Sequence, residues 1–346
     1  MNRQLPETIP CEDDLDEVMT RPSPELVDFI RTVRSPLVVL GAGGKMGPSL
    51  AVRAKRAADL AGVDLDVVAV SRFSEDATRS WLTERDVETR SVDLLDADSL
   101  ASLPEATDVI SLVGTKFGTS QNPSRTWAIN TLVPDRVARR YADARIVALS
   151  TGNVYPFVPT SSGGSVETDR LTPHGEYPFA AVARERIFEH HSQQQGTSIA
   201  LIRLNYAVDL RYGVLVDIGR RVLAGEPVDV TMGHLNCLWQ GDANDMILRS
   251  LALAESPPRP WNLTGRETLS VRSLAEEFGR LLGRPATIVG TEAETALLSD
   301  STALRQRLGD PPTPLDTVQR WTAHWLRSGG RLLDKPTHFE TRDGAY

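Results

Sequence analysis

A short apolar segment that runs directly into a glycine-rich loop constrains this chain more than any other feature. Residues 36–40 read Pro-Leu-Val-Val-Leu, and the next seven are Gly41-Ala-Gly-Gly-Lys-Met-Gly47. A branched apolar run bounded by Pro and Gly is typical of a strand buried in a parallel sheet. Glycines at this spacing permit a tight turn, let the backbone approach a pyrophosphate, and let the next helix pack on the strand. The segment predicts the first unit of a dinucleotide-binding domain.

The strand-helix alternation continues beyond this unit. We expect strands at 66–70, 89–92, 108–113, 145–149 and 198–204, and helices at 49–60, 75–83, 98–103, 126–141 and 179–195. Such alternation predicts a parallel sheet covered by helices on both faces. Beyond residue 205 the pattern weakens into mixed short elements. The predicted fold class is therefore α/β, a doubly wound Rossmann-type parallel sheet with a smaller C-terminal α/β lobe.

The same pattern divides the chain into segments. Residues 1–35 are predicted to form an N-terminal extension with one helix, which starts at Ser23-Pro24-Glu25. The other predicted segments are a dinucleotide-binding domain at 36–205, rejoined by about 235–263, a substrate-binding lobe at 206–234 and 264–330, and a polar tail at 331–346.

Composition excludes several classes of partner. The formal net charge of −8 opposes binding to nucleic acid or to an anionic membrane. Cys11 and Cys237 lie far apart, without the spacing of a zinc site or a disulfide framework, so no metal is expected. Acidic residues stand where a secretory signal would be basic and then apolar, and no apolar run is long enough to span a bilayer. These features predict a cytoplasmic protein with a small-molecule substrate.

The end of the second predicted strand bears on cofactor choice. A carboxylate there binds the ribose 2′-hydroxyl of NAD, whereas this chain has Ser71-Arg72. A hydroxyl and a guanidinium suit a 2′-phosphate, which favours NADP over NAD. Alternatively, Arg72 is a solvated residue or stacks on the adenine. Asp93 either accepts a hydrogen bond from the adenine amino group or caps the next helix.

Further motifs follow in order along the chain. They are Asn130, Ser150-Thr-Gly-Asn-Val-Tyr-Pro156, Tyr177 before a long helix, Arg203-Leu-Asn-Tyr206, and Gly265-x-x-x-Leu-Ser270. Together with the glycine loop and Asp93, these residues resemble the extended short-chain dehydrogenase/reductase family, often called NAD-dependent epimerase/dehydratases, over about residues 36–325. The resemblance implies hydride transfer to and from a nicotinamide cofactor, a hydroxylated carbohydrate-like substrate, and a homodimer formed by helices 126–141 and 179–195.

The resemblance also assigns cofactor contacts. The residues expected to contact the dinucleotide are Gly41, Gly43, Gly44, Lys45, Met46, Gly47, Ser71, Arg72, Asp93, Leu94, Val113, Gly114 and Asn130.

The catalytic set of the family is incomplete in this chain. The resemblance places Thr151 in the hydroxyl role and Tyr177 in the acid/base role, but the lysine four residues beyond the tyrosine is replaced by Ala181. A tyrosine ordinarily has a pKa of about 10, so a nearby cation is needed if it is to act as a base near neutrality. Lys116 and Lys45 are candidate replacements. Alternatively, both lysines contact only phosphate or solvent.

Polar residues cluster in the segments expected to line the substrate side. The candidates are Asn153, His174, Asn205, Tyr206, Arg211 and Trp239. Arg211 is the one expected to hold an anionic group of the substrate. For each single residue a structural role is also open, such as a turn-forming Asn or a core Trp.

These observations predict an NAD(P)-dependent epimerase or oxidoreductase acting on a carbohydrate-like molecule. Gly152 and Asn153 stand where sugar 4,6-dehydratases of the family carry an acidic pair, which argues against that elimination. The alternative is an NADP(H)-binding sensor or a non-redox enzyme on the same fold, which the loss of the lysine favours.

Overall fold

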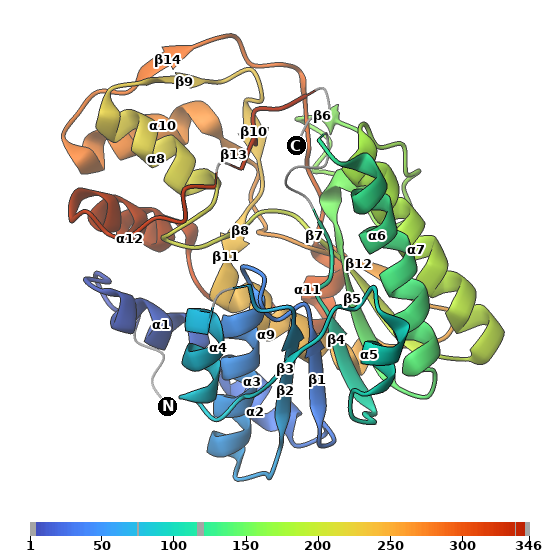
Figure 1. Cartoon of the computed structure of the whole chain (residues 1–346). Helices are drawn as coiled ribbons and strands as arrows, with labels where there is room; N and C mark the ends of the chain where they lie inside the picture. Colours follow the sequence, from blue (N-terminus) through green and yellow to red (C-terminus); the bar gives the residue numbers. More distant parts are fainter. Residues whose placement is uncertain (1–4, 75, 116–120, 336, 343–346) are drawn as a thin grey trace.

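A parallel sheet forms the centre of the protein. The computed structural model describes residues 5–74, 76–115, 121–335 and 337–342 (Figure 1). Within these residues the main sheet has seven strands in the order β12-β7-β5-β4-β1-β2-β3, and each neighbouring pair is parallel. The strands are β1 (Leu37–Leu40), β2 (Val67–Ser71), β3 (Glu88–Ser91), β4 (Asp108–Ser111), β5 (Arg145–Thr151), β7 (Ser198–Leu204) and β12 (Arg259–Leu263). The predicted doubly wound Rossmann-type sheet is confirmed.

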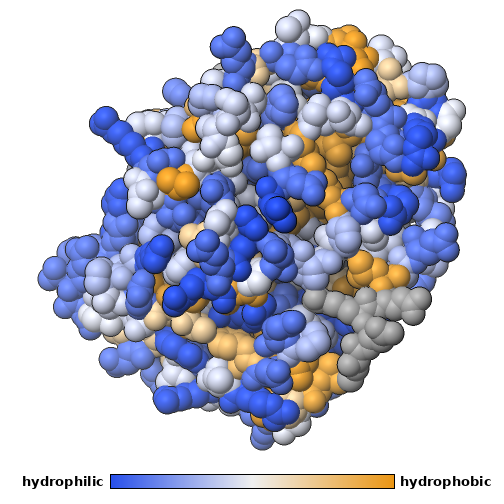
Figure 2. All heavy atoms as spheres, turned by 180° about the vertical axis from the view of Figure 1, so that it is seen from behind, coloured by the Kyte–Doolittle hydropathy of each residue, from blue (hydrophilic) through white to orange (hydrophobic). Residues whose placement is uncertain are grey.

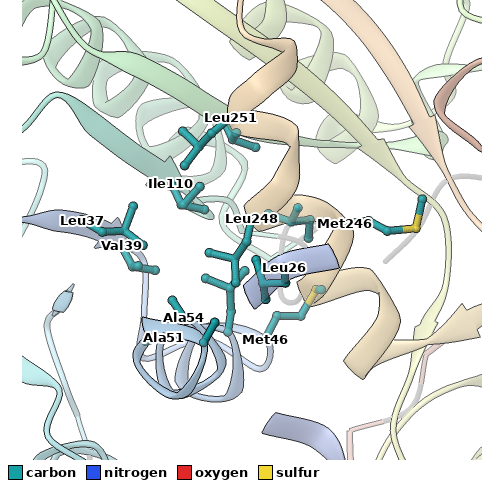
Figure 3. Packing of buried hydrophobic residues seen from close by; sticks show 14 of the residues in the cluster. Leu26, Leu37, Val39, Met46, Ala51, Ala54, Ile110, Met246, Leu248 and Leu251 are labelled. Carbon is teal, nitrogen blue, oxygen red and sulfur yellow. The ribbon is translucent and has the colours of Figure 1, made fainter. Parts of the chain in front are cut away.

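Helices cover both faces of this sheet. Successive residues of β1 point to opposite faces, so Leu37 and Val39 join one core, and Val38 and Leu40 join the other. Figure 3 shows Leu37 and Val39 facing residues of the helices that cover the first face. The first face is covered by α2 (Pro24–Ile30), α3 (Gly47–Ala61) and α9 (Gln240–Arg249), and the second by α5 (Ala97–Ala101), α6 (Pro123–Arg140) and α7 (Glu176–Gln195). Helix α4 (Asp76–Thr83) contacts β3 and α3.

A smaller lobe has its own hydrophobic core. It is built around α8 (Val214–Ala224), β9 (Pro227–Asp229), α10 (Val271–Leu282), β14 (Thr287–Val289) and α12 (Leu315–Arg327). Short strand pairs complete it and connect it to the sheet: β8 (Ala207–Val208) with β11 (Leu238–Trp239), β10 (His234–Leu235) with β13 (Leu269–Ser270), and β6 (Val158–Pro159) with β15 (Thr295–Ala296). Helix α11 (Thr302–Leu308) contacts β12, and Leu304 belongs to the core of the first face.

The N-terminal extension differs from expectation. One helix was predicted there, but two are present, because α1 (Glu12–Thr20) precedes α2. Arg21 has an extended backbone, as the residue before a proline usually does, and this separates the two helices. Leu15 and Met19 are fully buried in the core of the smaller lobe. The sequence signal for α1 is the i, i+4 spacing of these two apolar residues within an acidic segment, which places them on one face of a helix.

The C-terminal segment is anchored to the body of the protein. Thr337 and Phe339 are each 2% exposed. The guanidinium of Arg342 donates to the Thr295 carbonyl at 2.8 Å and lies 4.4 Å from the Phe157 ring centroid. The residues of the predicted polar tail that the structure describes therefore form part of the lobe.

Hydrophilic residues cover most of the face shown in Figure 2, where hydrophobic atoms emerge in separate areas. Within the described residues, no helix has both the length and the apolar character needed to cross a bilayer. The same residues contain no cluster of three His, Cys, Asp or Glu side chains that would hold a metal ion.

Candidate active site

The glycine loop is fixed at the carboxyl end of β1. The N–H groups of Gly41 and Ala42 both donate to the Val70 carbonyl of β2, at 2.8 and 3.0 Å. Gly41 has φ of +81°, which favours glycine, and an added Cβ there would lie 3.1 Å from the Val113 nitrogen. A Cβ on Gly47, where α3 begins, would collide with the backbone of Ala42. Glycine is therefore required at both ends of the loop.

The middle of the loop leaves room for a phosphate. An added Cβ on Gly44 would meet only the Gly41 carbonyl oxygen, at 3.3 Å, among the described atoms within 4 Å. The loop leads into the 15-residue helix α3, whose N-terminal N–H groups and dipole favour an anion. These residues fit the pyrophosphate of a dinucleotide.

The end of β2 lies beside this loop, and Asp93 follows β3, the next strand of the sheet. The Ser71 side chain is adjacent to Gly43, since a Cβ there would lie 2.6 Å from its hydroxyl oxygen, and Arg72 is exposed. The carboxylate of Asp93 accepts a hydrogen bond from the Leu95 backbone at 3.0 Å, and Leu94 is buried in the core of the second face. Asp93 therefore stabilises a turn in this structure.

A single cavity joins the loop to the predicted catalytic residues. The predicted site residues that line it are Gly41, Gly44, Lys45, Met46, Gly47, Gly114, Thr151, Asn153, Tyr177, Asn205 and Tyr206. Other predicted site residues lie within the described part of the chain but do not line this cavity. They are Gly43, Ser71, Arg72, Asp93, Leu94, Val113, Asn130, His174, Arg211 and Trp239. Lys116 lies outside the described residues.

Thr151 and Tyr177 reach the cavity from neighbouring elements. Thr151 is the last residue of β5, and its hydroxyl oxygen accepts the Asn153 N–H at 3.2 Å. Tyr177 lies in the first turn of α7, which begins after Gly175 at φ +92°. Each of the two residues is 8% exposed, so both hydroxyl-bearing side chains are almost fully enclosed.

The position of the missing lysine is filled by apolar packing. Ala181 is fully buried in a cluster with Val154 and Tyr155. The guanidinium of Arg184 lies near the Tyr177 side chain and donates to the Asn130 side-chain oxygen at 2.6 Å. It also donates to the Leu149 carbonyl at 2.5 Å.

Burial lowers the pKa of Arg184, while its contact with Tyr177 and the charge of Glu185 act in the opposite direction. Arginine remains protonated at physiological pH, so the cation beside Tyr177 persists.

Lys45 is oriented toward a different tyrosine. Its ammonium donates to the Ala207 carbonyl at 2.9 Å and lies 3.9 Å from the centroid of the Tyr212 ring. Burial raises the pKa of Tyr212. Lys45 therefore links the glycine loop to the smaller lobe at the edge of the cavity.

The predicted substrate residues divide into two groups. Asn153, Asn205 and Tyr206 line the cavity, and Tyr206 has a strained φ of +45°. Arg211 instead faces carboxylates: its guanidinium lies 2.9 Å from Asp209, 3.1 Å from Glu12 and 3.4 Å from Asp16. Against the lowering effect of burial, these charges raise the pKa of Arg211.

The two remaining candidates pack against aromatic rings. Trp239 meets Trp321 edge to face, with ring centroids 5.5 Å apart, and is 2% exposed. His174 is exposed and stacks on Phe157, with ring centroids 6.3 Å apart.

Several lining residues were not identified from the sequence. Gly213 and Val214, at the start of α8, and Thr337, from the C-terminal segment, complete the wall on the side of the smaller lobe. Arg184, which does not itself line the cavity, lies seven residues beyond Tyr177 and so on the same face of α7. No local pattern points to Thr337, because its position depends on the path of the chain.

Comparisons with known proteins agree with this geometry. A family model described as the NAD dependent epimerase/dehydratase family matches residues 37–225. A comparison with curated proteins found no significant match.

Solved structures share the fold at low sequence identity. A UDP-glucose 4-epimerase from Thermotoga maritima, with UDP-glucose, is 17% identical with a TM-score of 0.69, covering 85% of this chain and 99% of that chain. A UDP-glucose 4-epimerase from Thermus thermophilus, in complex with NAD, is 17% identical with a TM-score of 0.67 and the same coverage. A dTDP-glucose 4,6-dehydratase from Streptomyces venezuelae, with NAD bound, is 17% identical with a TM-score of 0.70, covering 84% and 97%.

Proposed function

Because the chain belongs to the NAD dependent epimerase/dehydratase family and is an enzyme of the extended short-chain dehydrogenase type, we propose that it transfers hydride between a nicotinamide dinucleotide and a hydroxylated, carbohydrate-like small molecule. The reaction is an epimerisation or a net oxidoreduction. The observation that carries this proposal is that Thr151, Tyr177 and the glycine loop line one cavity.

The residues of the chain have distinct tasks in this reaction. The backbone of the loop around Gly44 and the N-terminus of α3 hold the pyrophosphate. A nicotinamide dinucleotide, when bound, would supply the hydride chemistry at the substrate carbon. The Tyr177 hydroxyl exchanges the proton of the reacting substrate oxygen, and Thr151 donates a hydrogen bond that orients that oxygen. Both side chains are almost fully buried, which limits their own contact with water.

Two observations bear on the choice between NAD(H) and NADP(H). Ser71 and the exposed Arg72, at the end of β2, offer donors to a 2′-phosphate and favour NADP(H). The solved epimerase and dehydratase with NAD in their descriptions favour NAD(H). We propose that the pocket accepts a nicotinamide dinucleotide and that Arg72 sets the preference. Arg72→Ala is expected to weaken NADPH binding and to leave NADH binding unchanged.

The substrate is proposed to be a sugar, and nucleotide-linked sugars are the first to test. UDP-glucose is present in the structure of the similar Thermotoga epimerase. Dehydration is not proposed, because Gly152 and Asn153 follow Thr151 and neither side chain can act as an acid or base.

The experiment begins with fluorescence titration of the purified protein by NADH and NADPH. UDP- and dTDP-linked sugars are then screened by chromatography for epimers and by nicotinamide absorbance for net redox turnover. Tyr177→Phe is expected to lower turnover by about 10²-fold or more and to keep cofactor binding. Tyr141→Phe, at a tyrosine of the sheet core, is the matched control and should keep turnover.

Two results would contradict the proposal. Full turnover in Tyr177→Phe removes the acid/base assignment. Absence of dinucleotide binding removes the function itself. Cofactor binding without redox change across the sugar panel would favour the alternative, a sensor or a non-redox enzyme on this fold.

A further inference from the structure

We propose that Glu12 and Asp16 of α1 are positioning residues, which hold the part of the cavity wall that the smaller lobe contributes. We call residues 206–214 the lobe wall. The members of the lobe wall that line the cavity are Tyr206, Ala207, Val208, Tyr212, Gly213 and Val214. The proposal rests on the function proposed for the cavity, because it assigns the lobe wall to binding of the sugar. The placement of the wall by α1 can nevertheless be tested without any substrate.

The lobe wall faces the glycine loop across the cavity. The ammonium of Lys45 in the loop donates to the Ala207 carbonyl at 2.9 Å and lies 3.9 Å from the centroid of the Tyr212 ring. Gly213 has φ of +129°, and an added Cβ there would lie 3.1 to 3.2 Å from Val208, so the wall is tightly folded on itself. A shift of the wall therefore changes the space beside the loop.

Arg211 connects the lobe wall to α1. Its Nη1 lies 3.1 Å from a carboxylate oxygen of Glu12 and 3.4 Å from one of Asp16. Its Nη2 lies 2.9 Å from the Asp209 carboxylate. The side chains of Arg211 and Asp209 are 14% and 2% exposed, so solvent screens these charges only in part. Arg211 does not line the cavity, and its charge instead joins the wall to α1.

The backbone around Arg211 transmits its position to the cavity. The Asp209 carboxylate accepts the Arg211 N–H at 3.1 Å, and the Asp209 N–H donates to the Tyr212 carbonyl at 2.9 Å. The Arg211 carbonyl accepts the Leu333 N–H at 3.0 Å. Because Tyr212 and Gly213 follow Arg211 directly, a displacement of Arg211 moves two residues that line the cavity.

Glu12 contacts two segments that reach the cavity. Besides Arg211, its carboxylate accepts hydrogen bonds from Nε and Nη2 of Arg331, each at 3.0 Å. Arg331 begins the C-terminal segment, in which Thr337 lines the cavity. One carboxylate of α1 therefore holds both the lobe wall and the start of the C-terminal segment.

Asp16 connects the lobe wall to the dinucleotide-binding domain. One of its carboxylate oxygens, Oδ1, faces Arg211, and the other, Oδ2, accepts the indole N–H of Trp81 in α4 at 2.7 Å. Arg85, which follows α4, lies 4.0 Å from the same Oδ2. The Asp16 side chain is 16% exposed. This carboxylate therefore bridges the two lobes.

The helix that carries both carboxylates is itself fixed on two sides. Arg56 of α3 donates to the Thr20 hydroxyl at 2.6 Å and pairs with the Glu17 carboxylate at 2.7 Å. Leu15 and Met19 are buried in the core of the smaller lobe. In Figure 1, α1 lies between α12 of the smaller lobe and α4. Helix α1 precedes residue 37, where the match to the family model begins, so the family pattern assigns it no task.

The first test is hydrogen–deuterium exchange of the protein without cofactor or substrate. The double variant Glu12→Gln with Asp16→Asn removes both charges and keeps the size of both side chains. Amides of residues 207–213 are expected to exchange about tenfold faster or more than in the wild type, while those of β1 and β4 are unchanged. Asp13→Asn removes an exposed carboxylate from the same turn of α1 and should exchange like the wild type.

Further variants keep the test decisive. Asp16→Glu retains the charge and should restore part of the protection. Glu12→Gln alone, at a side chain that is 37% exposed, replaces the double variant if that protein does not fold. Faster exchange of α1 alone, with residues 207–213 exchanging as in the wild type, overturns the proposal. Uniformly faster exchange along the whole chain also overturns it, because that pattern indicates a loss of global stability.

The second test uses turnover, once a sugar substrate has been found. Thr151 and Tyr177 lie on β5 and α7, outside the lobe wall, so the chemical step should be retained. The double variant should raise the KM for the sugar by about fivefold or more and change kcat by less than about twofold. Arg211→Gln should have the same effect, and combining it with the double variant should add little, because the three side chains act together.

Two outcomes of this test separate the possible explanations. A raised KM in Arg211→Gln but not in the double variant shows that Arg211 acts on the substrate itself, and it overturns the proposal. If exchange of residues 207–213 accelerates as expected but no sugar is turned over, the positioning by α1 stands and the proposed function fails.

Discussion

The carboxylate of Glu185 and the guanidinium of Arg203 form a buried ion pair between α7 and β7, with Oε2 and Nη2 2.7 Å apart. Their side chains are 0% and 3% exposed. The pair extends into a network, since Glu185 also accepts the Ser150 hydroxyl at 2.5 Å, and Arg203 donates to the Tyr155 hydroxyl at 2.7 Å. The network thereby holds Ser150, which lines the cavity, and Tyr155, which is buried near it in sequence.

Breaking the Glu185–Arg203 ion pair should lower the free energy of unfolding. Glu185→Gln leaves the Arg203 guanidinium buried without its anion, so the free energy of unfolding should fall by about 3 to 5 kcal/mol. Urea unfolding followed by circular dichroism measures the change. Arg186→Gln removes an exposed ion pair one residue away and should change the free energy of unfolding by less than about 1 kcal/mol. Equal effects of the two substitutions would contradict this prediction.

Buried tyrosines predict how stability changes at alkaline pH. Burial raises the pKa of Tyr155 to about 12, although Arg203 acts against it. A tyrosine in the unfolded chain has a pKa of about 10, so below that pH the contribution of the Tyr155 hydroxyl to the free energy of unfolding is fully present. Between about pH 10 and 12 the unfolded chain releases the proton first, and the free energy of unfolding falls. Tyr155→Phe should make this fall shallower.

Tyr141→Phe is the matched comparison for Tyr155→Phe. Burial also raises the pKa of Tyr141 to about 12, but within the described part of the chain its hydroxyl makes a single hydrogen bond, of 3.3 Å, to the Pro104 carbonyl. At neutral pH, Tyr155→Phe should lower the free energy of unfolding by about 1 to 3 kcal/mol, because the Asn262 side-chain oxygen loses its 2.8 Å hydrogen-bond donor. Tyr141→Phe should lower the free energy of unfolding by less. Urea unfolding at several pH values checks both slopes.

Glycine substitutions near the two ends of α3 should separate an effect on NADH binding from an effect on folding stability. Among the described atoms within 4 Å, a methyl group on Gly44 meets only the Gly41 carbonyl oxygen, so Gly44→Ala should fold and yet place its methyl where a pyrophosphate approaches. NADH affinity is expected to fall by about tenfold or more, equivalent to about 1.4 kcal/mol. Gly62→Ala, at the other end of α3 with φ +65°, should lose about 1 to 2 kcal/mol of stability and keep NADH affinity. The prediction is wrong if both variants bind NADH like the wild type.

A homodimer through α6 and α7 is expected from the exposed apolar side chains on these helices. Leu132 of α6 is 49% exposed and Phe179 of α7 is 51% exposed, and the two helices lie side by side (Figure 1). Leu132→Glu and Phe179→Glu should each convert a dimer into a monomer in sedimentation experiments, because a charge is costly to bury in an apolar interface. Leu60→Glu, at an exposed leucine of α3, should leave the association state unchanged.

Much of the fold could be predicted because its determinants are local. Most strands of the main sheet contain a short apolar run, although β3 reads Glu-Thr-Arg-Ser, and the loop glycines mark where the first strand ends and α3 begins. Helix α1 was missed because its buried residues, Leu15 and Met19, are separated by acidic ones, and their core is made by distant segments. The anchored C-terminal segment was missed for the same reason: Thr337 is bonded to Asp217, 120 residues away.

The site was less predictable than the fold, because the role of a polar side chain depends on which residues it contacts in three dimensions. Thr151, Tyr177 and the glycine loop were chosen from motifs, and they line one cavity. Arg211 was chosen for its charge, yet three carboxylates surround it, two of them from α1. Arg184 was overlooked because the family pattern directs attention to position 181.

The anchoring of Thr337 has a consequence for the order in which the protein is built. Segments up to β5 can pair while later residues are still being synthesised, since domains form as their residues emerge. The core of the smaller lobe joins Leu15 of α1 to Trp321 of α12, and the cavity wall includes Thr337. A nascent chain therefore carries the glycine loop and both hydroxyl residues well before it has a closed pocket, and the ability to shield a reaction from water is acquired last.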